Sequence, residues 1–97
     1  MNVVYHLQNT EFEWDDNKAS INEDKHGVTF YEAAEVFFDP FYQGGDASVN
    51  AEIRDFVIGY SLSQRILLVV HTERGVRTRI ISARPATRAE RKQYEQK

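Results

Sequence analysis

Three strand-like runs in the second half of this chain constrain its fold more than any other feature. They cover residues 53–60, 66–73 and 76–83, and the last two are joined by a connection short enough for a tight hairpin. The middle run begins ILLVV and is apolar on both faces, as expected for a strand at the centre of a sheet. The pattern therefore predicts three consecutive antiparallel strands.

A shorter strand is predicted at residues 11–15, where polar and apolar side chains alternate. This alternation turns Phe12 and Trp14 toward a core. Residues 1–11 form an N-terminal extension, in which Val3 to Tyr5 either lengthen the strand or make an irregular arm.

Helix-start and helix-stop residues mark three helices. Two of them open with a T-x-x-E capping box, in which the threonine and the glutamate each satisfy a free backbone N–H group. The expected limits, in chain order, are Asp15 or Asp16 to Lys25, Thr29 to Asp39, and Thr87 to Gln96. Residues 41–52, which contain two adjacent glycines and no periodicity, are predicted to be a loop.

These elements predict a single α+β domain over residues 1–97, with helices packed on a small antiparallel sheet. Their order is strand, helix, helix, three strands, helix. The sequence has no cysteine, which excludes a disulfide framework, a thiolate zinc site and a cysteine nucleophile. No apolar run is long enough for a membrane span, and the first ten residues do not resemble a signal peptide. We therefore expect a cytoplasmic protein without membrane contact.

Charge is sorted along the chain. Residues 1–52 hold eleven Asp or Glu and two Lys, whereas residues 53–97 hold eight Arg, two Lys and four Asp or Glu. The net charge of −3 therefore conceals a basic second half, whose cations are mainly arginine. Guanidinium groups bind phosphate through paired N–H groups and stack on bases, so this half predicts a surface for a polyanion, most simply a nucleic acid.

The arginines lie on and between predicted strands. Arg77 and Arg79 are two residues apart on one strand, so they project from the same face and repel unless an anion lies between them. Glu73 on the partner strand and Arg84 at the end of the last strand are expected to converge with them. The alternative is that each arginine is a solvated surface charge in a weak ion pair.

Other polar residues have both a structural and a functional interpretation. Lys25 and His26 end the first helix, where they either complement the helix dipole or contact phosphate. Tyr94 either packs the last helix onto the sheet or donates its hydroxyl to phosphate. His71, alone at the end of an apolar strand, is expected to be a hydrogen-bonded structural histidine and not a catalyst.

No metal site or cofactor is predicted, because the histidines and the adjacent acid pairs lack ligand spacing and no P-loop is present. Cleavage of a phosphodiester would then use the ribose 2′-hydroxyl as the nucleophile, which restricts the substrate to RNA. Arginines would stabilise the charge that develops on the phosphate.

Several sequence blocks, in order over about residues 12–96, carry a family resemblance. They read FEWD, KHGVTF, EAAEVF, DP, IGYS, RILLVVHTERG, RIISAR and ATRAERKQYE. These blocks resemble the BrnT family of ribonuclease toxins from type II toxin–antitoxin pairs. The resemblance implies a compact fold similar to RelE and a toxin that cleaves mRNA and inhibits translation. It also implies a BrnA-type antitoxin with a ribbon-helix-helix domain, which forms an oligomer with the toxin and binds operator DNA.

Carried over by position, the resemblance implies a basic site with two polar partners. The catalytic residues that we expect are Lys25, His26, Glu73, Arg79, Arg84 and Tyr94. The RNA-binding residues that we expect are Arg54, Arg77, Arg88 and Arg91. Two alternatives stay open: a module that binds RNA or the antitoxin without cleavage, and a structural subunit whose arginines pair with an acidic partner.

Overall fold

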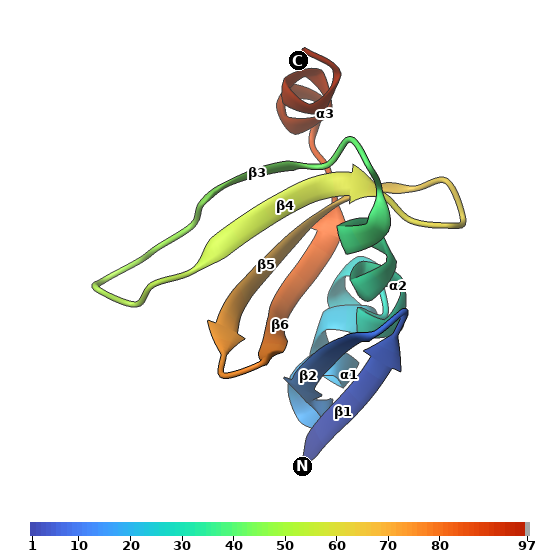
Figure 1. The fold of residues 1–97 in the computed structure, drawn as a ribbon. Coiled ribbons are helices and arrows are strands. Elements are labelled where there is room, and N and C mark those ends of the chain that lie inside the picture. The colour runs from blue at the N-terminus through green and yellow to red at the C-terminus, as the bar shows by residue number, and fades with distance from the viewer. Residues whose placement is uncertain (97) are drawn as a thin grey trace.

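The computed structural model describes residues 1–96 as a six-stranded mixed sheet with three α-helices and one short 3-10 helix (Figure 1). The elements in chain order are β1 (Asn2–Leu7), β2 (Thr10–Asp15), α1 (Asp16–His26), α2 (Phe30–Glu35), the 3-10 helix η1 (Val36–Phe38), β3 (Gln43–Asp46), β4 (Asp55–Tyr60), β5 (Ile66–Arg74), β6 (Arg77–Pro85) and α3 (Arg88–Glu95). Figure 1 shows α3 at one end of the sheet, apart from α1 and α2. No helix within residues 1–96 is long and apolar enough to cross a membrane.

The sheet order is β1-β2-β6-β5-β4-β3. The α+β class and the three antiparallel strands β4, β5 and β6 are confirmed, but the prediction of a wholly antiparallel sheet is wrong. β2 pairs with β6 in parallel, so that Glu11 lies beside Arg77 and Glu13 beside Arg79. The chain can make this parallel pair because α1, α2 and the other strands separate β2 from β6.

The predicted element order is also incomplete at two places. Residues 2–7 form a complete strand that pairs along its whole length with β2, through a turn at Gln8 and Asn9. The segment predicted as a loop contains β3, which pairs with β4 at the opposite edge of the sheet. Its glycines hide it from pattern analysis, yet a Cβ on Gly45 would lie 2.5 Å from the ring of Phe56, so the ring covers the glycine and would have to move for any larger residue.

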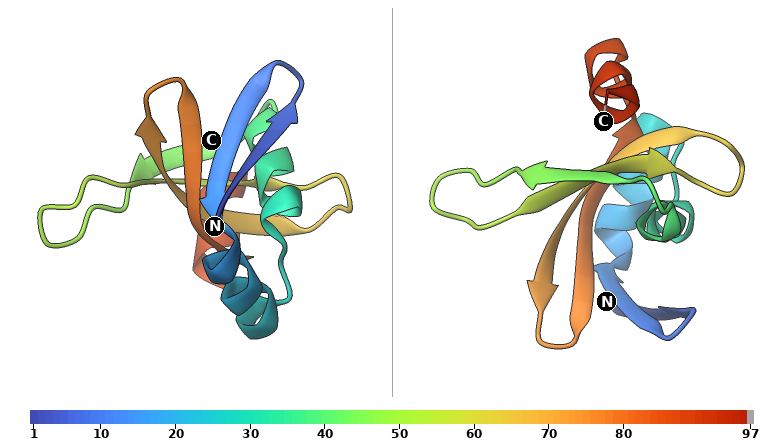
Figure 2. Two further views of the ribbon diagram at one scale, coloured as in Figure 1. Left: turned by 90° about the horizontal axis from the view of Figure 1, so that it is seen from below. Right: turned by 45° about the horizontal axis from the view of Figure 1, so that its top comes forward.

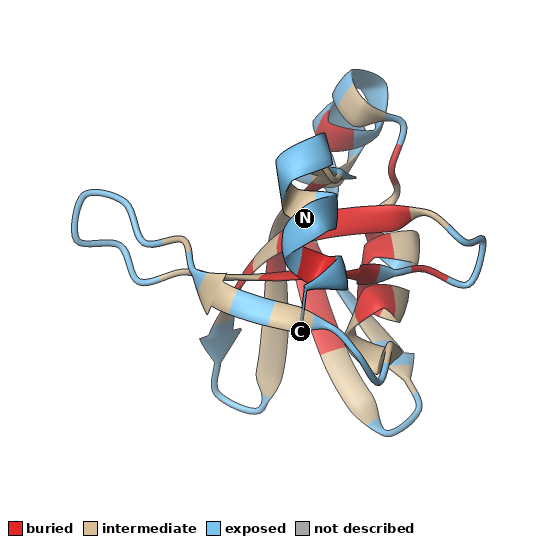
Figure 3. Ribbon diagram, turned by 90° about the horizontal axis from the view of Figure 1, so that it is seen from above, coloured by how far each residue is buried: buried red, intermediate tan, exposed pale blue. Residues whose placement is uncertain are grey.

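The core lies on both faces of β5. Leu67 and Val69 face the larger cluster with α2, whereas Ile66 and Leu68 face a smaller cluster under α3. Phe12 and Trp14 are buried as predicted. Figure 3 shows the buried residues concentrated in α2 and the middle strands, while the β3–β4 and β5–β6 turns are exposed. The β3–β4 turn extends away from the body of the molecule in both views of Figure 2.

Asn22 attaches α1 to the edge of β6. Its amide donates to the carbonyl oxygens of Ala83 (2.8 Å) and Val28 (3.1 Å), and its Oδ1 accepts from the N–H of Ala83 at 3.1 Å. β2 pairs with β6 only at residues 77–79. Farther along this edge of β6, where no strand pairs with it, the buried amide of Asn22 bonds the N–H and C=O groups of Ala83 instead. This contact fixes α1 beside β6.

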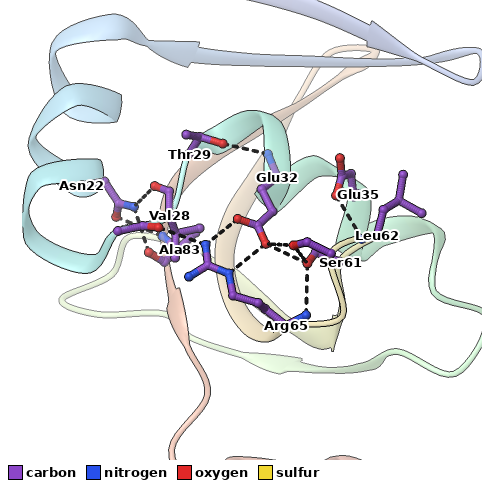
Figure 4. Close-up of polar contacts among 11 residues, drawn as sticks. Asn22, Val28, Thr29, Glu32, Glu35, Ser61, Leu62, Arg65 and Ala83 are labelled. Atoms are coloured by element: carbon purple, nitrogen blue, oxygen red, sulfur yellow. Dashed lines mark hydrogen bonds and ion pairs between the residues drawn. The ribbon is translucent and has the colours of Figure 1, made fainter.

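Glu32 attaches α2 to the β4–β5 connection (Figure 4). Its carboxylate accepts hydrogen bonds from Arg65 and from the hydroxyls of Ser61 and Ser63, both at 2.7 Å. Thr29 caps the helix by accepting from the N–H of Glu32, but the Glu32 carboxylate is not the reciprocal acceptor that a capping box predicts, because Arg65 engages it. The hydrogen bond from Arg65 lowers the pKa of Glu32 to about 2, despite the opposing effect of its burial.

We expect Glu32→Gln to lower the free energy of unfolding at neutral pH by roughly 2–4 kcal/mol, because it leaves Arg65 without its counter-charge. The depressed pKa means that the charge of Glu32 stabilises the fold above about pH 4.5 and loses this effect as the pH falls through about 2. Urea unfolding of the wild type and the variant should show that the difference between their free energies of unfolding becomes smaller as the pH falls through this range. A difference that stays constant would assign the effect to packing, and exposed Glu23→Gln on α1 serves as the control.

Candidate functional site

A basic groove runs along the face of the sheet opposite α2. It consists of two adjoining hollows, of about 340 and 240 Å³, that share Lys18 and Ile81. The larger hollow is lined by Lys18, Glu52, Ile53, Arg54, Thr72, Arg74, Arg79 and Ile81. The smaller hollow is lined by Lys18, Ile21, Asn22, Lys25, His26, Ile81 and Ser82.

The β5–β6 hairpin supplies the floor of the basic groove. Side chains alternate along a strand, so Ile80 enters the core with α2 while Arg79 points to the other face. The register shifts next to Val70 and His71, and Ile81 has no partner in it, which identifies Ile81 as the extra residue of a β-bulge. The two hollows therefore meet at the bulge.

Charge in the basic groove is strongly one-sided. Five cationic side chains and one histidine line it, against the single carboxylate of Glu52. Glu52 already accepts from Arg54 at 2.6 Å. Such a surface can hold several phosphates of one strand, because each neutralised phosphate releases a counterion.

A buried carboxylate lies beneath the arginines of the larger hollow. Glu13 accepts from Nη1 of Arg79 at 2.8 Å and lies 3.6 and 3.7 Å from nitrogens of Arg77 and Arg74. Burial raises the pKa of Glu13, but the hydrogen bond from Arg79 and the arginine charges outweigh it and hold the pKa below its usual value. Arg77 also donates from Nε to Glu11 at 3.0 Å. The sequence predicts that Arg77 and Arg79 repel each other unless an anion lies between them, and the carboxylates of β2 supply this negative charge.

The structure brings four of the predicted site residues together in the basic groove. They are Lys25, His26, Arg54 and Arg79. Arg77 lies next to them on the same face of β6 but is held by Glu11 and Glu13. These five residues come from α1, β6 and the end of the β3–β4 connection.

Other predicted site residues lie apart from the groove lining. Arg84 makes a two-pronged contact with Glu90, at 2.7 and 2.8 Å, and Glu90 also completes the capping box of α3. Glu73 accepts a hydrogen bond from the hydroxyl of Thr78, its partner on the facing strand β6. Arg88 and Arg91 are exposed on α3.

Tyr94 is buried against the sheet. Its hydroxyl donates to the carboxylate of Asp39 at 2.6 Å, and its ring packs edge-on against Tyr60. Burial, together with the hydrogen bond to Asp39, raises the pKa of Tyr94 to about 12. This is the packing role that the sequence left as one of two interpretations.

His71 is a buried histidine whose ring nitrogens make no hydrogen bond within residues 1–96, although Nδ1 lies 3.4 Å from Glu73. It packs edge-on against Phe37. Burial lowers the pKa of His71 against the opposing charges of Glu73 and Asp55. Its position in the core agrees with the structural role expected from the sequence, but the expected hydrogen bond is not formed within residues 1–96.

Sequence reasoning missed Lys18, Arg74 and Glu13. Arg74 stands directly opposite Arg77 in the hairpin, so its place on the arginine-bearing face follows from the predicted register. Lys18 and Glu13 reach this face only because β2 and α1 lie beside β6, which no local pattern shows. Within residues 1–96, no group of three or more His, Cys, Asp or Glu is arranged to hold a metal ion.

Comparison with known proteins points to one family. Residues 14–90 match the family model described as the ribonuclease toxin BrnT of type II toxin–antitoxin systems. Among solved structures, the chain is similar to the Brucella abortus ribonuclease toxin BrnT, with 27% sequence identity and a TM-score of 0.60. The similarity covers 77% of this chain and 94% of the Brucella chain. No curated protein matches the chain.

We expect Tyr94→Phe to lower the free energy of unfolding by about 1–2 kcal/mol, because Asp39 loses a hydrogen bond inside the fold. The affinity of the protein for RNA should not change. Urea unfolding and an RNA titration measure the two effects, and exposed Tyr31→Phe is the control. A loss of RNA binding as large as that of Arg79→Ala would instead place the Tyr94 hydroxyl in the site.

Proposed function

Because the chain belongs to the BrnT family of ribonuclease toxins of type II toxin–antitoxin systems, we propose that it cleaves mRNA in the basic groove. The observation that carries this proposal is the lining of the groove, where five cations and a histidine face one carboxylate. In a chain with a net charge of −3, this concentration of cations on one surface favours an anionic ligand.

The larger hollow is suited to hold phosphate. Arg54, Arg74 and Arg79 converge there from three segments, and guanidinium groups match phosphate oxygens two at a time. The smaller hollow adds Lys25 and His26 at the C-terminal end of α1. An RNA strand that crosses both hollows would place a phosphate near the shared Lys18.

The chemistry that we propose uses the RNA itself as nucleophile. The 2′-hydroxyl oxygen forms a bond to phosphorus and gives its proton to a base, while the bond from phosphorus to the 5′-oxygen breaks and that oxygen takes up a proton. The products are a 2′,3′-cyclic phosphate and a 5′-hydroxyl. His26 is suited to move one of these protons, because its imidazole ring has two nitrogens that can hold or release a proton. Arg79 and its neighbours would stabilise the charge on the phosphate.

The partner that we propose is a BrnA-type antitoxin with a ribbon-helix-helix domain. Membership of a type II system implies an antitoxin, which is a protein that binds the toxin directly. The antitoxin would cover the basic groove with an acidic or amphipathic segment and link the complex to operator DNA. We place both proteins in the cytoplasm, where mRNA is translated.

The alternative is a module that binds RNA or the antitoxin without cleaving RNA. The internal ion pairs favour it, since Arg77 and Arg84 are already engaged by Glu11 and Glu90. Cleavage assays separate the two functions.

Purified protein should cleave single-stranded RNA in the presence of EDTA, leave 2′,3′-cyclic phosphate ends, and leave DNA intact. Arg79→Ala and His26→Ala should each lower the cleavage rate by roughly 100-fold or more, because they remove charge stabilisation and proton transfer. Lys92→Gln on α3 is the matched control outside the groove. Activity that chelation abolishes and magnesium or manganese restores would contradict the metal-free mechanism, and RNA binding without cleavage would support the alternative.

Association with the antitoxin should be fast and should slow with added salt, because exposed charges are screened over a Debye length of about 8 Å at physiological ionic strength. Stopped-flow association rates across a salt series test this. Arg54→Gln should lower the rate at low salt, whereas Lys92→Gln should not. A rate independent of salt, or an interface on the acidic residues of α1, would show that the antitoxin binds elsewhere.

A further inference from the structure

We propose that Glu13 is a positioning residue, a buried carboxylate that sets the guanidinium of Arg79 at the angle from which it meets an RNA phosphate. The inference rests on the proposed ribonuclease function, and it concerns a residue that lies beneath the basic groove and outside its lining.

The first observation is the burial of Glu13. The residue is 4% exposed, and a buried carboxylate must be paired or it destabilises the fold. Its counter-charges are the arginines of the hairpin, with Arg79 at 2.8 Å and Arg77 and Arg74 more distant. The parallel register of β2 and β6 places Glu13 directly beside Arg79, so the backbone fixes the contact.

The second observation is the state of Arg79. Within residues 1–96, the only side-chain nitrogen of Arg79 that donates a hydrogen bond is Nη1. It donates to Glu13 and, at 2.9 Å, to Oδ1 of Asn2. Nε and Nη2 therefore keep their N–H groups for a ligand in the larger hollow, which Arg79 lines. Two acceptors bound to Nη1 fix the plane of the guanidinium group. The edge formed by Nε and Nη2 is then the one that pairs with phosphate.

The two acceptors come from neighbouring strands. Asn2 stands at the start of β1, which is outside the residues that match the family model, and it is exposed. Glu13 is in β2, which pairs with β1. The first two strands thus form a support for one arginine of the groove.

Positioning and simple electrostatics predict opposite results when the charge of Glu13 is removed. A carboxylate that only opposes the arginines would weaken RNA binding, so Glu13→Gln would bind RNA more tightly and cleave it at least as fast. A positioning carboxylate holds Arg79 for the transition state, so Glu13→Gln would lower kcat, since a displacement of about 1 Å can reduce a rate by roughly 100-fold.

Glu11 supplies a matched control. It lies two residues away on the same strand and face, and it pairs with Arg77 instead of Arg79. Glu11→Gln removes the same charge from the same surface without touching Arg79. Asn2→Ala is the second variant: it removes the other acceptor of Arg79 at an exposed position, where the fold should tolerate the change.

The experiment measures kcat and KM on a short RNA, and the affinity for the same RNA with 2′-O-methyl groups that block cleavage. Thermal unfolding establishes that each variant is folded at the assay temperature. We expect Glu13→Gln to lower kcat by about 10- to 100-fold without weakening affinity, Asn2→Ala to lower kcat by about 3- to 10-fold, and Glu11→Gln to keep kcat within about twofold.

Each outcome decides a different claim. Equal kcat values for wild type, Glu13→Gln and Asn2→Ala would overturn the positioning role and leave the ribonuclease function intact. Equal losses in Glu11→Gln and Glu13→Gln would also overturn it, because charge alone would then explain both. If Glu13→Gln fails to fold, an unchanged kcat in Asn2→Ala overturns the proposal. No cleavage by the wild-type protein would instead overturn the proposed function.

Discussion

The parallel pairing of β2 with β6 is the contact on which the rest of the structure depends. It joins the acidic half of the chain to the basic half, and it places Glu11 and Glu13 beside Arg77 and Arg79. Arginines two residues apart on a strand share one face and repel each other, and the carboxylates of β2 offset this repulsion. The charge sorting along the sequence therefore serves two purposes: part of the positive charge is neutralised inside the sheet, and the remainder lines the groove.

Two polar side chains hold the helices that flank this sheet. Asn22 completes the edge of β6 where β2 departs from it, and Glu32 ties α2 to the β4–β5 connection through Arg65. Because α1 carries Lys18, Lys25 and His26, the amide of Asn22 also sets one wall of the basic groove. The hydrogen bonds of Asn22 therefore stabilise the fold and also position this wall of the groove.

The sequence predicted what depends on local pattern. The limits of α1 and α3, the β5–β6 hairpin and the burial of Phe12 follow from capping residues, turn length and alternation. The second predicted helix, expected to reach Asp39, ends as an α-helix at Glu35 and continues as the 3-10 helix η1. It could not predict β3, because two glycines carry no pattern, or the parallel pair, because strand neighbours far apart in the chain leave no local signal. The basic groove divides in the same way: the face on which Arg79 lies follows from alternation along its strand, whereas the position of Glu13 beneath it depends on the fold. Likeness to RelE stays a prediction, since the comparisons concern BrnT.

The order in which the chain is synthesised gives the Glu13–Arg79 contact a further consequence. The two residues are 66 positions apart, and β6 is the last strand to leave the ribosome. A nascent chain that lacks β6 has neither the floor of the groove nor a counter-charge for Glu13, so the groove forms only after β6 has left the ribosome. A cleavage site in this groove would therefore be inactive in the nascent chain until β6 is in place.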